Sequence, residues 1–358
     1  MPAADYNDRR GAGRATNMST HYLVTGGAGF IGSNYVHRLL QRGEKVTIFD
    51  NLSRLGAPLN LAWLEESFGK SAYQLIVGDV ADASLLADAA RSADVIIHLA
   101  GQVAVTSSVT DPRTDFLANA LGTFNALQAA RMSGRDPIFL FASTNKVYGG
   151  MEDVPLVEHP TRWSYADLPE GCPETQPLDF HSPYGCSKGA ADQYVRDYSR
   201  IYGLRTVVFR QSCIYGPRQF GVEDQGWLAW LVIAAVTGTP ITIYGDGKQV
   251  RDVLHVDDLL DVYDAAVARI DAARGQVYNI GGGPENVLAV WAEFGPMLEQ
   301  LLGRPISVSR ADWRPGDQRV FLADVGKAKR DLDWSPGISL KAGIESLFTW
   351  VEANKSLF

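Results

Sequence analysis

Short runs of apolar residues alternate along this chain with longer segments in which apolar residues recur every three or four positions. The short runs predict buried strands, and the longer segments predict amphipathic helices. We expect strands at residues 21–24, 46–49, 73–77, 94–99, 137–142, 205–209 and 277–280, and helices at 33–41, 84–91, 115–132, 184–202 and 227–237. This order is typical of an α/β fold with a parallel sheet and helices on both of its faces.

The alternation becomes irregular after about residue 210, which indicates a second, smaller lobe. The run Val277-Tyr278-Asn279-Ile280 again resembles a core strand, so the chain is expected to return to the first lobe there. Residues 1–19 are polar and rich in Gly, Ala and Arg, which predicts a disordered tail, and Met18 is an alternative start. The expected division is a tail at 1–19, a nucleotide-binding domain at 20–210 joined by 253–282, and a substrate-binding lobe at 211–252 and 283–358.

Composition narrows the class of protein. The 358 residues are 46% hydrophobic and 21% charged, which suits a soluble globular protein with a sizeable core. The net charge of −8 argues against a nucleic-acid surface. Cys172, Cys186 and Cys213 are too few and too scattered for a disulfide framework or a zinc site, so we expect no metal and a cytoplasmic setting. Neither a membrane span nor the apolar centre of a signal peptide is found.

A glycine-rich stretch, Thr25-Gly26-Gly27-Ala28-Gly29-Phe30-Ile31-Gly32, connects the first expected strand to the first expected helix. In this context Gly26 permits a sharp turn, Gly29 lets the backbone approach a pyrophosphate, and Gly32 lets the helix pack on the strand. The anion is expected at the helix N-terminus, where free N–H groups favour negative charge. The stretch therefore predicts a Rossmann-type dinucleotide site; a glycine-rich turn without a ligand is the alternative.

The nucleotide is predicted to be NAD. Asp50 ends the second expected strand, where a carboxylate accepts hydrogen bonds from an adenosine ribose. The same charge repels a 2′-phosphate and so favours NAD over NADP, although Arg54 nearby leaves NADP open.

A catalytic set is predicted from two separate segments. Ser143 and Thr144 follow an expected strand, so their hydroxyl groups lie at the carboxyl edge of the sheet, where ligands collect. Tyr184 and Lys188 are spaced to lie one turn apart on one helical face. An ammonium and an oxidised nicotinamide near Tyr184 are expected to stabilise its phenolate, which then removes a proton from a hydroxyl group while hydride leaves the same carbon. Thr144 is expected to hydrogen-bond the reacting oxygen.

With these motifs, the chain resembles the extended short-chain dehydrogenases/reductases, the family of nucleotide-sugar epimerases and dehydratases. The resemblance covers about residues 20–350 and includes Gly78-Asp79-Val80, His98-Leu99-Ala100, Asn119, Arg251-Asp252-Val253-Leu254-His255-Val256-Asp257 and Arg314-Pro315-Gly316-Asp317. It implies that NAD contacts Gly26, Gly29, Phe30, Ile31, Gly32, Asp50, Asn51, Asp79, Val80, Leu99, Ala100, Asn119, Tyr184 and Lys188. It implies that a nucleotide-diphosphate sugar contacts Gln102, Asn145, Arg218, Gln219, Gln225, Arg251 and Arg314.

The residues that follow Thr144 narrow the choice within this family. The 4,6-dehydratases generally carry Asp-Glu there, whereas this chain has Asn145-Lys146, so a conventional dehydratase is not expected. This loop, residues 179–194, residues 215–227 and residues 247–255 are similar to those of CDP-tyvelose (CDP-paratose) 2-epimerases. The resemblance implies transient oxidation of the sugar at C2 and return of the hydride to its other face.

Two other functions remain open at this point. One is a 4-epimerase acting on UDP-glucose or UDP-glucuronate, and the other is an NAD-binding sensor that has lost catalysis. The nucleobase and the exact sugar are likewise open. By analogy with the family, a homodimer is expected, with the helices at 115–132 and 184–202 forming a four-helix bundle.

Overall fold

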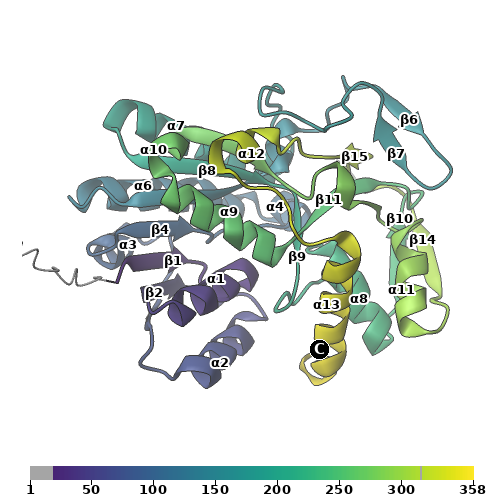
Figure 1. Cartoon of the computed structure of the whole chain (residues 1–358), viewed down its shortest axis with the longest axis horizontal. Helices are drawn as coiled ribbons and strands as arrows, with labels where there is room; N and C mark the ends of the chain where they lie inside the picture. The colour runs from purple at the N-terminus through teal and green to yellow at the C-terminus, as the bar shows by residue number, and fades with distance from the viewer. Residues whose placement is uncertain (1–18, 315–316) are drawn as a thin grey trace, which may run out of the picture.

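A parallel sheet of seven strands forms the larger part of the protein (Figure 1). Its order is β12-β8-β5-β4-β1-β2-β3, and every neighbouring pair is parallel. The strands are β1 (His21–Thr25), β2 (Lys45–Asp50), β3 (Gln74–Val77), β4 (Val95–His98), β5 (Ile138–Thr144), β8 (Arg205–Gln211) and β12 (Gln276–Ile280). The order of the strands reverses between β1 and β4, which places a topological switch point there. The expected fold class is confirmed.

The computed structural model describes residues 19–314 and 317–358. The tail expected at residues 1–19, Met18 included, therefore lies outside the described residues except for Ser19. Pro315 and Gly316 of the Arg314 motif also lie outside them. No helix within the described ranges is long and apolar enough to cross a membrane.

Helices cover both faces of the sheet. One face packs against α1 (Phe30–Gln41), α2 (Ala57–Phe68), α9 (Val256–Ala268), α10 (Ile270–Ala273) and α12 (Gly326–Leu332), and the other against α3 (Ala83–Ala90), α6 (Gly122–Met132) and α7 (Ser182–Tyr202). Successive residues of a strand point to opposite faces, so Val24 joins the first core and Leu23 the second. Burial on both faces explains why these strands are continuous apolar runs rather than alternating ones.

Three elements differ in their bounds from the expected ones in ways that matter for the site. Helix α1 begins at Phe30, three residues before the expected position, because the glycine loop leads directly into it. Strand β5 extends through Thr144. The helix expected at 115–132 is divided into α5 (Pro112–Phe116), a π-helical turn (Leu117–Leu121) and α6. Such π turns are frequent at functional sites.

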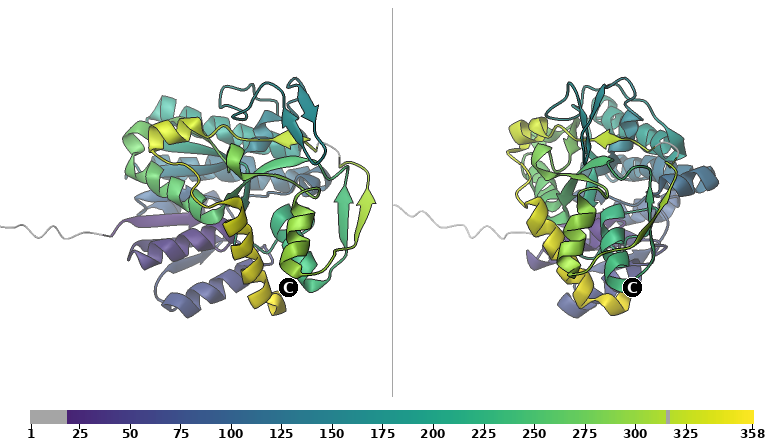
Figure 2. Two further views of the ribbon diagram at one scale, coloured as in Figure 1. Left: turned by 45° about the vertical axis from the view of Figure 1, so that its right-hand side comes forward. Right: turned by 90° about the vertical axis from the view of Figure 1, so that its right-hand side faces the viewer.

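The smaller lobe packs beside the sheet and is seen most clearly after rotation (Figure 2). Its core joins α8 (Trp227–Thr237), α11 (Phe294–Leu302) and α13 (Leu340–Ala353) to short strands. These strands are β9 (Cys213–Tyr215), β10 (Ile241–Tyr244), β11 (Val250–His255), β13 (Val287–Ala289), β14 (Val308–Ala311) and β15 (Val320–Phe321). A hairpin of β6 (Leu156–Glu158) and β7 (Trp163–Tyr165) projects next to β11 and β15 (Figure 1).

Segments cross between the two lobes. Strand β12 pairs with β8 from Gln276 to Ile280, at one edge of the large sheet. From the segment 283–358, Ala328 and Leu332 of α12 join the core of the sheet rather than that of the smaller lobe. The two lobes are therefore interleaved along the sequence.

Candidate active site

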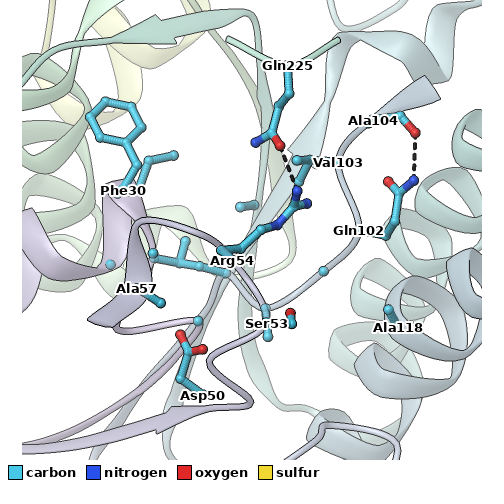
Figure 3. A pocket seen from close by; sticks show the side chains of 18 of the residues that line it. Phe30, Asp50, Ser53, Arg54, Ala57, Gln102, Val103, Ala104, Ala118 and Gln225 are labelled. Carbon is cyan, nitrogen blue, oxygen red and sulfur yellow. Dashed lines mark hydrogen bonds between the residues drawn. The ribbon is translucent and has the colours of Figure 1, made fainter. Parts of the chain in front are cut away.

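A cavity of about 840 Å³ lies where the strands of the large sheet end, next to the switch point. Its walls come from the segments after β1, β2, β3, β4 and β5 and from the loop at residues 216–226 (Figure 3). The predicted site residues that line it are Gly26, Gly29, Phe30, Ile31, Gly32, Asp50, Asn51, Asp79, Val80, Leu99, Ala100, Gln102, Thr144, Tyr184, Lys188, Arg218, Gln219 and Gln225. The remaining four predicted residues, Asn119, Asn145, Arg251 and Arg314, do not line this cavity.

The glycine loop forms one end of the cavity. Gly26 has φ of +71°, and a Cβ there would approach the backbone nitrogen of Ala100 to 2.8 Å. A Cβ on Gly32 would lie 2.2 Å from the carbonyl oxygen of Gly26, so α1 packs directly on the turn. Gly29 is the N-cap of α1 and supplies no side-chain hydrogen bond. The N–H groups of the first turn are thus available to an anion.

Two carboxylates lie next to this loop. Asp50 accepts hydrogen bonds from the backbone N–H of Ala28 at 2.9 Å and of Leu52 at 2.8 Å. Burial raises the pKa of Asp50, and these two N–H donors oppose the rise by stabilising the charged form. Asn51 donates to Asp79 at 2.9 Å and thereby connects the ends of β2 and β3. The arrangement places hydrogen-bond acceptors beside the helix N-terminus.

The three predicted catalytic residues meet at the cavity wall. Thr144 ends β5, while Tyr184 and Lys188 lie one turn apart near the start of α7, and all three are buried. The Thr144 hydroxyl is near enough to the Tyr184 phenol to favour its charged form. Lys188 donates to the carbonyl oxygen of Ala142 at 2.5 Å and lies 4.3 Å from the centroid of the Phe141 ring. The phenol therefore faces Thr144, and the ammonium faces the backbone of β5.

Burial shifts the pKa values of both Tyr184 and Lys188. Burial raises the pKa of Tyr184 to about 12, and the groups that oppose the rise are Thr144, by its hydrogen bond, and Arg54, by its charge. Lys188 and an oxidised nicotinamide were expected to lower this pKa together; in the structure the Lys188 ammonium donates to the carbonyl oxygen of Ala142. Burial lowers the pKa of Lys188 to about 8, and the charges of Asp192 and Asp115 raise it in part.

Asn119 does not line the cavity but hydrogen-bonds a residue that does. Its Oδ1 accepts from the backbone N–H of Gln102 at 3.0 Å, and its Nδ2 donates to Asp115 at 3.0 Å and Ser187 at 3.1 Å. Ser187 lies between Tyr184 and Lys188 on α7. Asn119, in the π-helical turn, therefore connects the loop after β4 to α7.

The two residues after Thr144 are packed behind it. Asn145 is buried, and its Oδ1 accepts from the Thr144 hydroxyl at 3.3 Å. Lys146 donates to Gln318 at 3.1 Å. Burial lowers the pKa of Lys146 to about 8, and the nearby charge of Arg251 lowers it further. The segment after β5 thus contacts the smaller lobe.

Two of the arginines predicted to contact the substrate, Arg251 and Arg314, lie in the smaller lobe. Arg251, on β11, is buried and pairs with Asp317 at 2.7 Å. Arg314 lies 4.0 Å from the centroid of the Tyr244 ring and forms ion pairs with Glu223 at 3.6 Å and Asp224 at 3.4 Å. Both guanidinium groups are therefore held by the protein's own side chains.

Comparison with known proteins identifies the family. Residues 22–281 match the family described as the NAD dependent epimerase/dehydratase family, which is most of the chain. The chain belongs to this family. The epimerase/dehydratase match begins at β1 and ends after β12, so it covers the whole seven-stranded sheet.

Individual relatives are similar along nearly their full length. A CDP-paratose 2-epimerase from Salmonella typhi is 44% identical over 92% of this chain and 99% of its own. A solved dTDP-glucose 4,6-dehydratase from Streptomyces venezuelae, with NAD bound, has a TM-score of 0.80 and 30% identity, covering 95% of this chain and 99% of its own. A UDP-glucose 4-epimerase from Thermotoga maritima has a TM-score of 0.79 and 29% identity, covering 95% of this chain and 100% of its own.

The described residues fit the NAD on which this family depends. The uncapped start of α1, the close packing of Gly26 and Gly32, and the acceptors of Asp50 form a cradle for a pyrophosphate and a ribose. The cavity continues from this cradle to Tyr184, so a dinucleotide reaches from one to the other. No group of three or more His, Cys, Asp or Glu suited to a metal ion occurs in the part of the chain that the structure describes.

Sequence reasoning missed other residues that line the cavity. They include the loop residues Ser53, Leu55, Gly56, Val103, Ala104, Ser212, Phe220, Gly221 and Val222, as well as Ser107 and Thr114 in short helices and Gln211 at the end of β8. Arg54 was considered only in relation to NADP, yet it crosses the cavity and donates to Gln225 at 2.7 Å (Figure 3). Loops carry no periodic pattern, so only Phe220, next to Arg218 and Gln219 in the sequence, had a signal that pointed to it.

Proposed function

We propose that this chain inverts C2 of a CDP-linked hexose of the paratose/tyvelose type, by transient oxidation to a keto-sugar followed by reduction on the other face. The observation that carries the proposal is the meeting of Thr144, Tyr184 and Lys188 at the wall of the NAD cavity, with Asn145 and Lys146 directly behind. This position lacks the two carboxylates expected of a 4,6-dehydratase. The Salmonella typhi relative supports the choice of C2 and of a CDP-sugar.

In the proposed reaction, Tyr184 accepts the proton of the sugar C2 hydroxyl and later returns it. Thr144 hydrogen-bonds the same oxygen and shares the charge that develops on it. Lys188 keeps a positive charge within one turn of the phenol, and its contact with Ala142 fixes its position. NAD⁺, when bound, supplies the hydride acceptor and a further positive charge beside the phenol. That charge favours the phenolate, which burial otherwise disfavours.

We infer that Arg251 and Arg314 hold the diphosphate of the substrate. Guanidinium groups bind phosphate oxygens with paired hydrogen bonds, and both arginines lie in the lobe opposite the NAD cradle. Because C2 is closer to the diphosphate than C4 is, a 2-epimerase must hold the hexose in a different register from a 4-epimerase. The carboxylates of Asp317 and Glu223 keep the two side chains in place before the substrate arrives.

The position of inversion tests this function. The purified protein would be incubated with CDP-, UDP-, GDP- and dTDP-hexoses in deuterated buffer, and the products analysed by NMR. We expect inversion at C2 of a CDP-hexose with no deuterium from the solvent at that carbon, because hydride returns from the cofactor. Inversion at C4 of a UDP-sugar would replace the proposal with the 4-epimerase alternative, and solvent deuterium at C2 would point to deprotonation instead.

We also infer that two copies of the chain associate through α6 and α7. Large apolar side chains are exposed on these helices and on α5: Phe116, Met132, Tyr194, Ile201 and Tyr202. Contiguous apolar patches on helices usually mark an interface, and a two-fold axis lets the same patch meet itself. Ile201 and Tyr202 lie at the C-terminal end of α7, whereas Tyr184 and Lys188 lie near its start.

A further inference from the structure

A hydrogen bond between the two lobes crosses the cavity. Arg54, in the loop between β2 and α2, donates from Nη1 to Oε1 of Gln225 at 2.7 Å. Gln225 lies in the loop at residues 216–226, just before α8. Both side chains line the cavity, and Figure 3 shows the Arg54 side chain extending across it toward Gln225.

A second contact lies next to this hydrogen bond. A Cβ on Gly56 would lie 2.2 Å from Cδ2 of Phe220, so the backbone of the first loop touches the aromatic ring of the second. The Phe220 ring packs in turn against the rings of Trp350 and Phe358, with centroids 5.6 Å and 5.4 Å away. Any side chain at position 56 would force the two loops apart.

The start of the loop at residues 216–226 is held firmly. The carbonyl oxygen of Pro217 accepts a hydrogen bond from Asn34 of α1 at 3.1 Å. Arg218 has φ of +70°, a left-handed conformation that is uncommon for a residue with a side chain, and its guanidinium lies 4.2 Å from the centroid of the Trp63 ring on α2. The start of this loop is therefore held against α1 and α2, while its later part contacts residues 54–56.

We propose that Arg54 and Gln225, together with the contact of Gly56 with Phe220, form a clasp that slows the exchange of NAD with the solvent. This inference rests on the proposed function, in which the hydride must return from the same cofactor to the same sugar. A cofactor that left between the two halves of the reaction would strand a keto-sugar. The clasp joins opposite walls of the cavity in which the dinucleotide is expected to lie, so it must part when the dinucleotide leaves across it.

The exchange rate of NAD tests the clasp. Holoenzyme would be mixed with excess deuterated NAD, and the bound cofactor analysed by mass spectrometry over time. The variants are Arg54→Met and Gln225→Met, which keep most of the side-chain volume and remove the hydrogen bond, and the double variant. Arg91→Met is the matched control, because Arg91 is exposed on the surface after α3 and pairs only with Asp88 among the described residues.

We expect each single variant to exchange NAD about fivefold faster than the parent, as loss of one hydrogen bond allows, with the control unchanged. The double variant should be no faster than either single one, because both changes remove the same contact. Exchange rates equal to that of the parent would overturn the clasp. So would a double variant whose rate increase equals the product of the two single increases, because that result indicates two independent contacts with NAD. A parent that carries and accepts no NAD would instead contradict the proposed function.

Discussion

Tyr184 and Lys188 are neighbours on one helical face, yet their polar ends have different partners. The phenol lies near the Thr144 hydroxyl, whereas the ammonium donates to the carbonyl of Ala142. Burial shifts the pKa of both groups toward their neutral forms, to about 12 for the phenol and about 8 for the ammonium. Neither shift favours the phenolate, and in the proposed reaction the charge of NAD⁺ would add to its stabilisation.

The role of the phenol is tested by Tyr184→Phe, which removes only the hydroxyl group. We expect kcat to fall by about a thousandfold, the size typical for loss of a general base, while the NAD content of the purified protein stays the same. Both quantities are measurable on one preparation, by NMR turnover assays and by the absorbance of released cofactor. Tyr202→Phe, at the exposed end of the same helix, is the control. Full activity of Tyr184→Phe would favour the alternative of a non-catalytic NAD-binding sensor.

Because His98 is buried in its neutral form, we expect the stability of the protein to depend on pH. His98 is fully buried at the end of β4 between the hydroxyl groups of Thr25 and Thr123, at 2.8 Å and 3.1 Å. Burial, with a smaller contribution from Lys188, lowers its pKa to about 3. Below pH 6.5 the unfolded chain binds a proton there that the folded chain does not, so the stability present above pH 6.5 is lost as the pH falls toward 3.

The measurement is the free energy of unfolding in urea between pH 6.5 and 5. His98 is expected to contribute a loss of up to ~1.4 kcal/mol per pH unit in this range. His98→Gln should be less stable at pH 7 but show a shallower decline, and His159→Gln, at an exposed position, should keep the slope of the parent. Equal slopes in all three proteins would show that His98 is not the group responsible.

At the scale of elements, α7 connects the catalytic pair to a buried polar network. Asp192, one turn after Lys188, accepts two hydrogen bonds from Arg210 of β8, at 2.9 Å and 3.0 Å. It also accepts one from Ser143, the neighbour of Thr144, at 2.8 Å. Arg210 reaches on to the Tyr148 hydroxyl at 3.0 Å. The network therefore connects α7, β5 and β8 next to Thr144 and Lys188.

Asp192→Asn tests this network, because it removes the charge and leaves Arg210 buried without its partner. Breaking one member of a buried ion pair costs about 3 kcal/mol or more of the free energy of unfolding. Urea denaturation of the variant should show this loss. Asp88→Asn, which breaks the exposed pair with Arg91, should change stability by less than about 0.5 kcal/mol. A similarly small effect at Asp192 would mean that the network adds little to the packing of α7.

At the scale of the whole molecule, the cavity exists only where the two lobes meet. The sheet supplies the cradle for NAD, and the loop at residues 216–226 supplies the opposite wall (Figures 1 and 3). Arg251 and Arg314, which we propose as contacts of the substrate diphosphate, lie on the other lobe. The exposed Met132, Ile201 and Tyr202 lie at the C-terminal ends of α6 and α7, which fits the proposed contact between two copies.

Ile201→Glu tests that contact. Ile201 is exposed near the end of α7, and a charge at a buried apolar interface is costly because it loses its hydration. We expect light scattering to show twice the mass of the chain for the parent and the mass of one chain for the variant. Val157→Glu, on the exposed hairpin strand β6, should leave the mass of the parent unchanged. A parent that is monomeric at all concentrations would contradict the proposed dimer.

Much of the fold and part of the site could be predicted because they depend on short stretches of sequence. The apolar runs of the strands and the glycine stretch before α1 are local patterns, and β1, α1 and β2 were expected close to where they lie. The spacing of Tyr184 and Lys188 likewise follows from the helix alone. The orientation of the Lys188 ammonium does not, because it depends on the backbone of β5, more than forty residues away in the sequence.

By itself, then, the sequence determined the parallel sheet, the dinucleotide loop and the residue types at the catalytic edge, since periodicity and backbone conformation are set by neighbouring residues. Only the tertiary structure decided that Asn119 hydrogen-bonds the backbone of Gln102 and that Arg54 hydrogen-bonds Gln225 across the cavity. These contacts join residues from loops, which have no repeating pattern to reveal their partners. Their geometry arises from how two lobes pack, and packing depends on the whole chain at once.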